Sequence, residues 1–174
     1  HQQTLHILEA TERVNDNQKN VLFKKLCRFY GGVEHLNGKT VALWGLSFKP
    51  NTDDMREAPS LILLKELFAA GCRVRAYDPV ASSEALRVLE RDHGAARVEE
   101  MLTICSSATA AVDNADVLVL VTEWKEFRAP DFRHLAQTLR GKAIFDGRNI
   151  YDPAEVAAAG LSYEGIGRIS RKAA

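Results

Sequence analysis

D-V-L-V-L-V-T at residues 116–122 and T-V-A-L-W-G at residues 40–45 are two short, continuous apolar stretches bounded by polar loops. Runs of this kind are typical of strands that are buried on both faces of a parallel sheet. The rest of the sequence repeats the pattern. Further strands are expected at residues 73–78, 141–147 and 161–166, and residues 97–105 are ambiguous, with room for a short third strand.

Helical patterns separate these strands. Pro59 and Gly71 bracket one helix, in agreement with the preference for Pro in the first turn and Gly after the last turn. Asp152 is expected to cap a helix that begins at Pro153. Other helices are expected at residues 82–92, 108–114 and 130–139. The alternation predicts an α/β fold, with a doubly wound, mainly parallel, Rossmann-like sheet and an N-terminal helix.

The chain begins at His1 in a helical pattern that continues to about residue 30, and no capping residue precedes it. We expect this start to be a cut through a longer polypeptide, although a processed or tagged terminus would look the same. The expected division is a helical segment at residues 1–30, one globular domain at residues 31–167 and a basic tail at residues 168–174.

Charge and composition exclude several classes of partner. Lys and Arg together number 23, as do Asp and Glu together, so nothing global favours nucleic acid or an anionic membrane. No apolar run approaches the ~20 residues that span a bilayer. The three cysteines form no C-x-x-C pair and the five histidines have no ligand spacing, so no metal site is predicted. Sparse, unpaired cysteines indicate a reducing, cytoplasmic location.

Ligands of doubly wound sheets bind at the carboxyl ends of the strands. The loop after the first strand reads G-L-S-F-K-P-N-T-D-D-M-R-E-A-P-S at residues 45–60. It lacks the G-x-G-x-x-G of a dinucleotide-binding loop, but Lys49 and Arg56 suit the capture of an anion near a helix N-terminus. The alternative is a solvated loop whose charges pair with one another, and the residues alone leave both interpretations open.

Two more loops are expected at the same edge of the sheet. D-G-R-N at residues 146–149 offers Arg148 as a third cation, or else forms a turn with an exposed arginine. T-E-W-K-E-F-R at residues 122–128 places Trp124 and Phe127 just after a central strand. These aromatic side chains could cover a ligand or a neighbouring domain, or they could cap the edge of the core.

No catalytic residue is predicted from local motifs. Cys27 lies in a helical pattern without a histidine nearby in the sequence, and neither a G-x-S-x-G elbow nor a Walker loop occurs. The residues themselves therefore indicate a binding domain more than a complete active site.

The loop at residues 45–60 also resembles the signature of the C-terminal domain of the UDP-glucose/GDP-mannose dehydrogenases. Further matches follow in order: Y-D-P at 77–79, A-D-V-L-V-L-V-T-E-W-K-E-F at 115–127 and F-D-G-R-N-I-Y-D-P at 145–153. V-N-D-N-Q-K at residues 14–19 looks like the end of the family's central helix. The resemblance covers nearly the whole chain, and P-N-T-D-D-M-R and T-E-W-K-E-F look more like UDP-glucose than UDP-N-acetyl-sugar members.

The resemblance implies a place in a larger enzyme. Members of the family join an N-terminal Rossmann domain for NAD, a central helix and a C-terminal domain for UDP-sugar, and they oxidise a primary alcohol twice to a carboxylate. It follows that residues 31–167 are the UDP-sugar-binding domain and residues 1–30 the end of the central dimerisation helix with a connecting helix. The family's catalytic cysteine motif and NAD fingerprint are missing here, so the chain alone is expected to be inactive.

Four residues take their expected roles from the resemblance. Phe48 and Lys49 match the family's substrate-contacting pair, and Arg148 matches an arginine that contacts substrate, in some members from the partner subunit. Arg56 matches an arginine that reaches the NAD of the neighbouring domain. The full enzyme is expected to be a cytoplasmic homodimer that takes UDP-glucose or a related nucleotide sugar.

Two alternatives remain at this stage. The chain could be the corresponding domain of a UDP-N-acetyl-hexosamine or GDP-mannose dehydrogenase. It could also be a stand-alone nucleotide-binding module that has no chemistry of its own.

Overall fold

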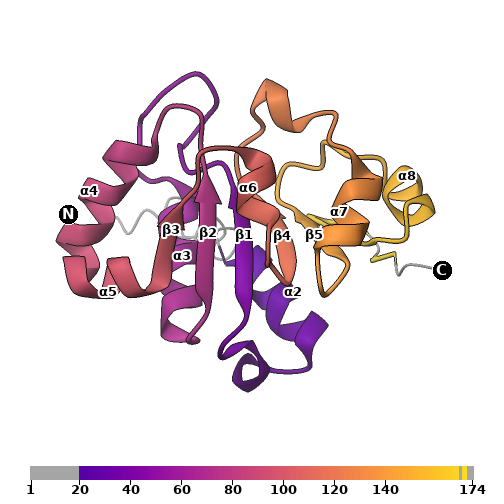
Figure 1. Ribbon diagram of the computed structural model, residues 1–174, viewed down its shortest axis with the longest axis horizontal. Coiled ribbons are helices and arrows are strands. Elements are labelled where there is room, and N and C mark those ends of the chain that lie inside the picture. The colour runs from indigo at the N-terminus through magenta and orange to yellow at the C-terminus, as the bar shows by residue number, and fades with distance from the viewer. Residues whose placement is uncertain (1–19, 169, 172–174) are drawn as a thin grey trace, which may run out of the picture.

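A computed structural model of the chain describes residues 20–168, 170 and 171. Their centre is a sheet of six strands in the order β3-β2-β1-β4-β5-β6, and every neighbouring pair is parallel (Figure 1). This is the strand order of a doubly wound sheet built from two halves. The strands are β1 (Thr40–Trp44), β2 (Arg73–Tyr77), β3 (Leu102–Ile104), β4 (Val117–Leu120), β5 (Ala143–Asp146) and β6 (Ser162–Gly165).

Helices alternate with the strands along the chain. The α-helices are α2 (Val21–Tyr30), α3 (Pro59–Ala69), α4 (Ser82–His93), α5 (Ala95–Met101), α6 (Ala108–Val112), α7 (Phe132–Thr138) and α8 (Pro153–Ala158). Two short 3-10 helices, η1 (Val33–Leu36) and η2 (Lys125–Phe127), lie in the connections. The Asp131 and Asp152 carboxylates cap α7 and α8 by accepting hydrogen bonds from main-chain N–H groups of the first turn.

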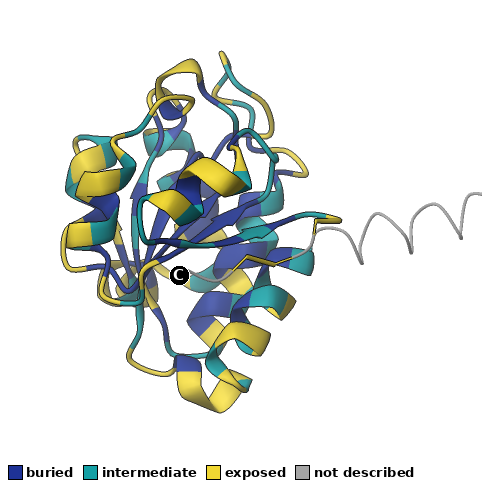
Figure 2. Cartoon of the chain, turned by 90° about the vertical axis from the view of Figure 1, so that its right-hand side faces the viewer, coloured by how far each residue is buried: buried dark blue, intermediate teal, exposed yellow. Residues whose placement is uncertain are grey.

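The alternation of side chains along each strand divides the core into two layers. Val41 and Leu43 of β1 face the layer that contains buried residues of α2, α3, α4 and α5. Ala42 and Trp44 of the same strand face the opposite layer, which contains buried residues of α6, α7 and α8. Figure 2 shows the buried sheet between the two helical layers. Because β1 and β4 are buried on both faces, their sequences are continuous apolar runs.

The predicted fold class is confirmed. The ambiguous stretch at residues 97–105 contains both the end of α5 and the edge strand β3. Of the N-terminal helix expected over residues 1–30, the structure describes only α2, and residues 1–19 lie outside the described range. None of the helices in the described residues is both long and apolar enough to cross a membrane.

Part of the segment assigned to the tail contacts the domain. The Arg168 guanidinium donates hydrogen bonds to the main-chain carbonyls of Tyr151 and Asn149, at 3.0 and 3.3 Å. Arg171 pairs antiparallel with Tyr163 through two main-chain hydrogen bonds. Arg168 and Arg171 are therefore both held against the domain.

Candidate functional site

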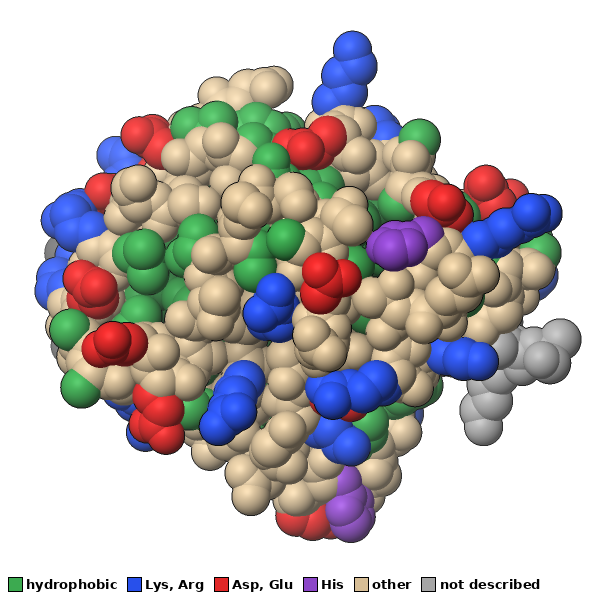
Figure 3. Space-filling model, in the orientation of Figure 1, with side chains coloured by type: hydrophobic (Ala, Val, Ile, Leu, Met, Phe, Trp, Pro, Cys, Tyr) green, Lys and Arg blue, Asp and Glu red, His purple; other side chains and the backbone are tan. Residues whose placement is uncertain are grey.

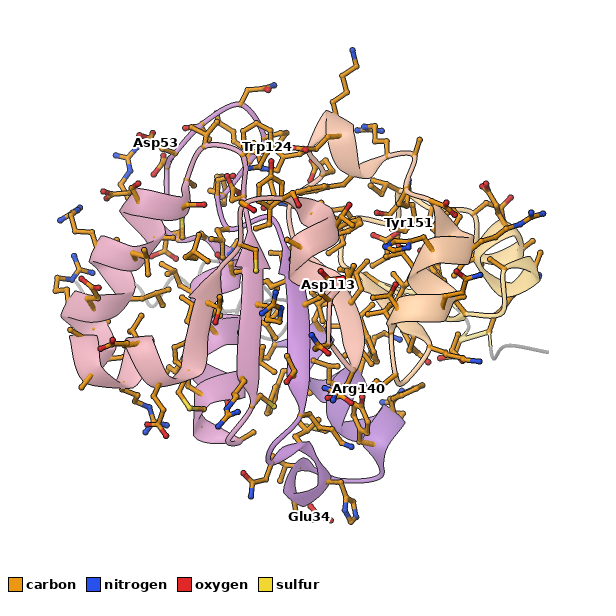
Figure 4. The ribbon with its side chains drawn as sticks, in the orientation of Figure 1. Glu34, Asp53, Asp113, Trp124, Arg140 and Tyr151 are labelled. Carbon is orange, nitrogen blue, oxygen red and sulfur yellow. The ribbon has the colours of Figure 1, made fainter. Side chains whose placement is uncertain are left out.

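The candidate site lies at the carboxyl edge of the sheet, between β1 and β4. The chain proceeds from β1 to β2 on one side of the sheet and from β4 to β5 on the other, so β1 and β4 flank the topological switch point. Figure 4 shows Asp53 and Trp124 at this edge and Arg140 toward the opposite one. The loops that follow β1, β4 and β5 meet here, as the sequence predicted, and the loop after β2 joins them through Asp78.

The first loop crosses close to the end of β4 because residue 45 is glycine. Gly45 has φ of +87°, and a Cβ at this position would lie 2.5 Å from the Thr122 Cβ and 2.7 Å from the Thr122 main-chain nitrogen. The Thr122 hydroxyl donates a 2.5 Å hydrogen bond to the Ser47 carbonyl. Gly45 is therefore needed because the first loop packs closely against the end of β4, and not because a pyrophosphate approaches the main chain there.

The base of the first loop is held by the buried carboxylate of Asp78, directly after β2. Its Oδ2 accepts hydrogen bonds from the main-chain N–H groups of Leu46 and Ser47, at 2.7 and 3.1 Å, and from the Trp124 indole at 3.1 Å. Its Oδ1 accepts from the N–H groups of Val80 and Ala81. Burial alone would raise the pKa of Asp78, but these main-chain donors outweigh it and leave the pKa below its ordinary value.

The tip of the first loop is open to solvent. The Phe48 N–H donates a 2.9 Å hydrogen bond to the Asp54 carbonyl, which closes residues 48–54 into a compact turn. Phe48 itself is 43% exposed, and Lys49 is also exposed. The buried base and the exposed tip together present an aromatic ring and a lysine on a rigid support.

Arg148 reaches this tip from the loop after β5. Its Nε donates a 2.7 Å hydrogen bond to the Val121 carbonyl, and its Nη2 donates a 3.2 Å hydrogen bond to the Phe48 carbonyl. The Glu123 Oε2 lies 2.7 Å from the Arg148 Nε. The structure thus brings Arg148 and the Phe48–Lys49 pair together within one chain, so no second subunit is needed to place this arginine near Lys49.

The D-G-R-N turn that carries Arg148 is itself fixed. Asp146 is buried; its Oδ1 accepts from the Arg148 N–H at 3.0 Å, and its Oδ2 accepts from the Tyr151 N–H and the Tyr163 hydroxyl, both at 3.0 Å. Asn149 exchanges two hydrogen bonds with the main chain of Ile166. Arg148 therefore projects from a supported turn, which reduces the entropy lost on binding.

Arg56 stands apart from these residues. Its side chain is 89% exposed and makes a two-pronged ion pair with Asp54, with N–O distances of 2.9 and 2.8 Å. The hydrogen bonds from Arg56, with a smaller attraction from Lys49, lower the pKa of Asp54 from 3.8 to about 2. The sequence left open whether the charges of this loop pair with one another, and the structure shows that Arg56 does pair with Asp54.

The aromatic residues after β4 are core residues. Trp124 is only 7% exposed and Phe127 is fully buried, and Phe127 stacks on Trp44 with ring centroids 5.1 Å apart. They belong to the core and hold the segment after β4 in place. Basic and acidic side chains are interspersed on the face drawn in Figure 3, so anion binding depends on individually placed cations.

None of the cysteine thiols is set up as a nucleophile. Burial raises the pKa of Cys72 to about 12 and also raises the pKa values of Cys27 and Cys105. Each thiol is therefore protonated at neutral pH and weakly reactive. In the described part of the chain, no group of three or more His, Cys, Asp or Glu side chains could hold a metal ion.

Residues 42–153, which include all of these loops, match the model of the UDP-glucose/GDP-mannose dehydrogenase family, UDP binding domain. The chain belongs to the UDP-glucose/GDP-mannose dehydrogenase family. It is 50% identical over 162 residues to a UDP-glucose 6-dehydrogenase of Pseudomonas aeruginosa, covering 93% of this chain and 34% of that protein. A UDP-glucose 6-dehydrogenase of Rhizobium meliloti is 39% identical, with 97% and 36% covered.

Solved structures of the UDP-glucose/GDP-mannose dehydrogenase family share the fold. A UDP-glucose dehydrogenase from Pyrobaculum islandicum superposes with a TM-score of 0.72 at 29% identity, covering 92% of this chain and 32% of that one. A GDP-mannose dehydrogenase from Pseudomonas aeruginosa gives 0.64 at 26% identity, with 93% and 34% covered. The chain spans about a third of the length of these relatives.

Sequence reasoning missed three residues that shape this family's site here. Asp78 ends a predicted strand and opens a candidate loop, and Asp146 begins the predicted D-G-R-N turn, but the sequence predicts no role for either carboxylate. It also predicts no role for Glu123 within T-E-W-K-E-F. A carboxylate at the carboxyl end of a strand is the signal that could have found Asp78 and Asp146, because a buried charge needs partners from neighbouring loops.

Proposed function

We propose that this chain is the C-terminal, UDP-sugar-binding part of a UDP-glucose 6-dehydrogenase. The full enzyme would convert UDP-glucose, two NAD and water to UDP-glucuronate and two NADH. The observation that carries the proposal is the convergence of Arg148 and the Phe48–Lys49 tip at the switch point between β1 and β4. Two cations at that edge suit a nucleotide diphosphate, for which arginine offers paired donors and lysine a point charge.

Arg148 and Lys49 have complementary parts in this proposal. The Nε and one Nη2 hydrogen of Arg148 are engaged by the Val121 and Phe48 carbonyls, and no hydrogen bond from its Nη1 to a described residue occurs. The remaining N–H groups are thus directed to a ligand by a guanidinium that is already oriented. Lys49 adds a mobile charge, and the exposed ring of Phe48 offers an apolar surface beside it.

The residues present do not fit NAD in this domain. In a dinucleotide site the helix begins directly after the first strand and the pyrophosphate sits on its N-terminus. Here α3 begins only at Pro59, which has no N–H, and the Ser60 hydroxyl bonds back to the Leu46 carbonyl. NAD would bind mainly to the preceding domain, and we propose that the exposed Arg56 reaches toward it.

The chemistry requires a nucleophile that this chain does not supply. All three thiols have raised pKa values, and none forms a hydrogen bond with the described residues of the Arg148 turn. We therefore propose that the chain binds nucleotide sugar but does not oxidise it by itself. We also propose that the full enzyme is a cytoplasmic homodimer, because residues 14–19 resemble the end of the helix through which the family dimerises.

Titration calorimetry of the purified chain tests the proposal. UDP and UDP-glucose should bind, and Arg148→Ala should weaken both by about ten- to a hundred-fold, since a charge-assisted hydrogen bond contributes about 1.5–3 kcal/mol. Arg133→Ala, on the exposed face of α7, is the matched control and should leave both affinities unchanged. Absence of binding, or equal effects of the two substitutions, would contradict the proposal.

The identity of the sugar is tested with the full enzyme. UDP-glucose should be oxidised in preference to UDP-N-acetylglucosamine and GDP-mannose when all three are assayed with NAD. Preference for UDP-N-acetylglucosamine or for GDP-mannose would instead indicate the corresponding alternative, a UDP-N-acetyl-hexosamine or a GDP-mannose dehydrogenase. The chain alone, given UDP-glucose and NAD, should produce no NADH.

A further inference from the structure

Among the described residues, Glu123 is the acidic side chain that forms an ion pair with the Arg148 guanidinium. It directly follows Thr122, whose hydroxyl bonds to the Ser47 carbonyl, so the main chain at Glu123 is fixed. Its Oε2 lies 2.7 Å from the Arg148 Nε, and the two side chains are 30% and 31% exposed. Both side chains are therefore partly shielded from water. Charges in such an environment interact more strongly than charges at an open surface.

The contact between these two side chains is a charge contact without a hydrogen bond. The hydrogen of the Arg148 Nε points to the Val121 carbonyl, at 2.7 Å. The Glu123 Oε2 is buried and accepts no hydrogen bond from the described residues. A buried carboxylate oxygen without a donor is costly and is rare in native proteins, so its presence calls for an explanation.

Orienting Arg148 is not that explanation. The guanidinium is already held by two main-chain carbonyls on separate loops, those of Val121 and Phe48. Those two hydrogen bonds fix the plane of the guanidinium, and the turn that carries it is fixed through Asp146. Glu123 contributes negative charge at a site whose geometry is set without it.

We propose that Glu123 is a resident anion of the Arg148 site, and that its charge limits the affinity of this site for nucleotide phosphates. This inference rests on the function proposed above. Without ligand, the carboxylate neutralises the guanidinium. When a diphosphate binds to the free N–H groups of Arg148, the carboxylate stays beside it and repels it.

Such a limit suits an enzyme domain that must release its product. Binding energy expressed equally in substrate, transition state and product does not accelerate the chemical step, and it slows release of the product. Glu123 would lower the affinity for every ligand that carries the diphosphate. Glu123 is therefore a residue that tunes ligand affinity, and not a catalytic one.

The test compares charge with shape in the purified chain. Glu123→Gln keeps the size of the side chain and removes its charge, and Glu123→Ala removes both. Each should tighten UDP binding by about three- to ten-fold in calorimetric titrations at fixed ionic strength. Glu123→Asp retains the charge and should stay within about two-fold of the wild type, and uridine, which has no phosphate, should show no gain with any variant.

Glu126→Gln is the matched control for a nearby loss of charge. Glu126 lies three positions further on, in η2, and is exposed; within the described residues its carboxylate accepts a hydrogen bond from the Tyr77 hydroxyl, at 3.4 Å. It should leave the affinity for UDP unchanged. Thermal melting of each variant checks that the fold is retained.

Two results would overturn the inference. If both Glu123→Gln and Glu123→Ala bound UDP more weakly than the wild type, Glu123 would stabilise the site instead of limiting its affinity. Unchanged binding by both would make its charge irrelevant. If the wild type binds UDP and Arg148→Ala weakens it, either result removes only the inference; if neither the wild type nor Glu123→Gln binds UDP, the proposed function fails as well.

Discussion

The Arg148 guanidinium donates a hydrogen bond to the main-chain carbonyl of Phe48, 3.2 Å away and 100 positions earlier in the sequence. This contact joins the loop after β5 to the loop after β1 across the end of β4. A ligand that displaced the Arg148 guanidinium would therefore also affect the loop that carries Phe48 and Lys49. The two loops therefore form one continuous surface at the carboxyl edge of the sheet.

Lys49→Ala should weaken UDP-sugar binding to the full enzyme by about ten- to a hundred-fold, because a charged hydrogen bond to phosphate is lost. Since Lys49 is exposed, the free energy of unfolding should not change. Calorimetric titration and urea unfolding measure the two effects. Lys65→Ala on α3, which is also exposed, is the control. Equal affinities of the two variants for UDP-sugar would favour the alternative, in which the loop is a solvated surface without a role in binding.

Arg56→Ala should act on the other substrate. Because Arg56 points into solvent and is paired only with Asp54, we expect it to face the domain that binds NAD. In steady-state kinetics of the full enzyme the Michaelis constant for NAD should rise more than that for UDP-glucose. A larger rise for UDP-glucose would place Arg56 in the sugar-nucleotide site instead.

The Asp54 carboxylate should titrate at low pH. Its pKa is lowered from 3.8 to about 2, chiefly by the hydrogen bonds from Arg56. A depressed pKa in the folded state contributes stability above pH 3.8 that is lost as the pH falls through about 2. Carbon-13 NMR of the carboxyl group follows the titration directly, and the midpoint should return toward 3.8 in Arg56→Ala. An unchanged midpoint in that variant would rule out the pairing seen here.

Asp78→Ala should be strongly destabilising. The substitution leaves buried N–H groups of Leu46, Ser47 and Ala81 and the indole of Trp124 without their acceptor. Loss of such a buried network costs about 3–4 kcal/mol. Urea unfolding measures it, with Asp92→Asn on the surface of α4 as the control, which should change the free energy by less than about 0.5 kcal/mol. A small effect of Asp78→Ala would mean that the loop base is held by other contacts.

Much of the fold could be predicted because it is encoded locally. Residues 41–44 and 117–121 are apolar throughout, since both strands are buried on two faces, and turn residues separate them from the helices. The edge strand β3 has only three residues and follows α5 without a break, so no periodicity could separate it from the helix. Its position depends on pairing with β2, which is a tertiary contact.

The site could be predicted in part for the same reason. Lys49 and Arg148 follow predicted strands, so the rule for parallel sheets brought them to one edge. The partners of the Asp78 Oδ2 lie 31 to 46 positions away along the chain, and no local pattern reveals such contacts. The contact of Glu123 with Arg148 also depends on tertiary structure, because it forms only when β4 and β5 are paired.

A titration of the nitrogen-15-labelled chain with UDP, followed by two-dimensional NMR, tests the central claim most directly. The account predicts that the largest amide shifts occur at Phe48, Lys49, Glu123 and Arg148, and that amides at the opposite edge, such as Arg140, do not shift. Shifts centred on the amino edge of the sheet, or no shifts at saturating UDP, would contradict it.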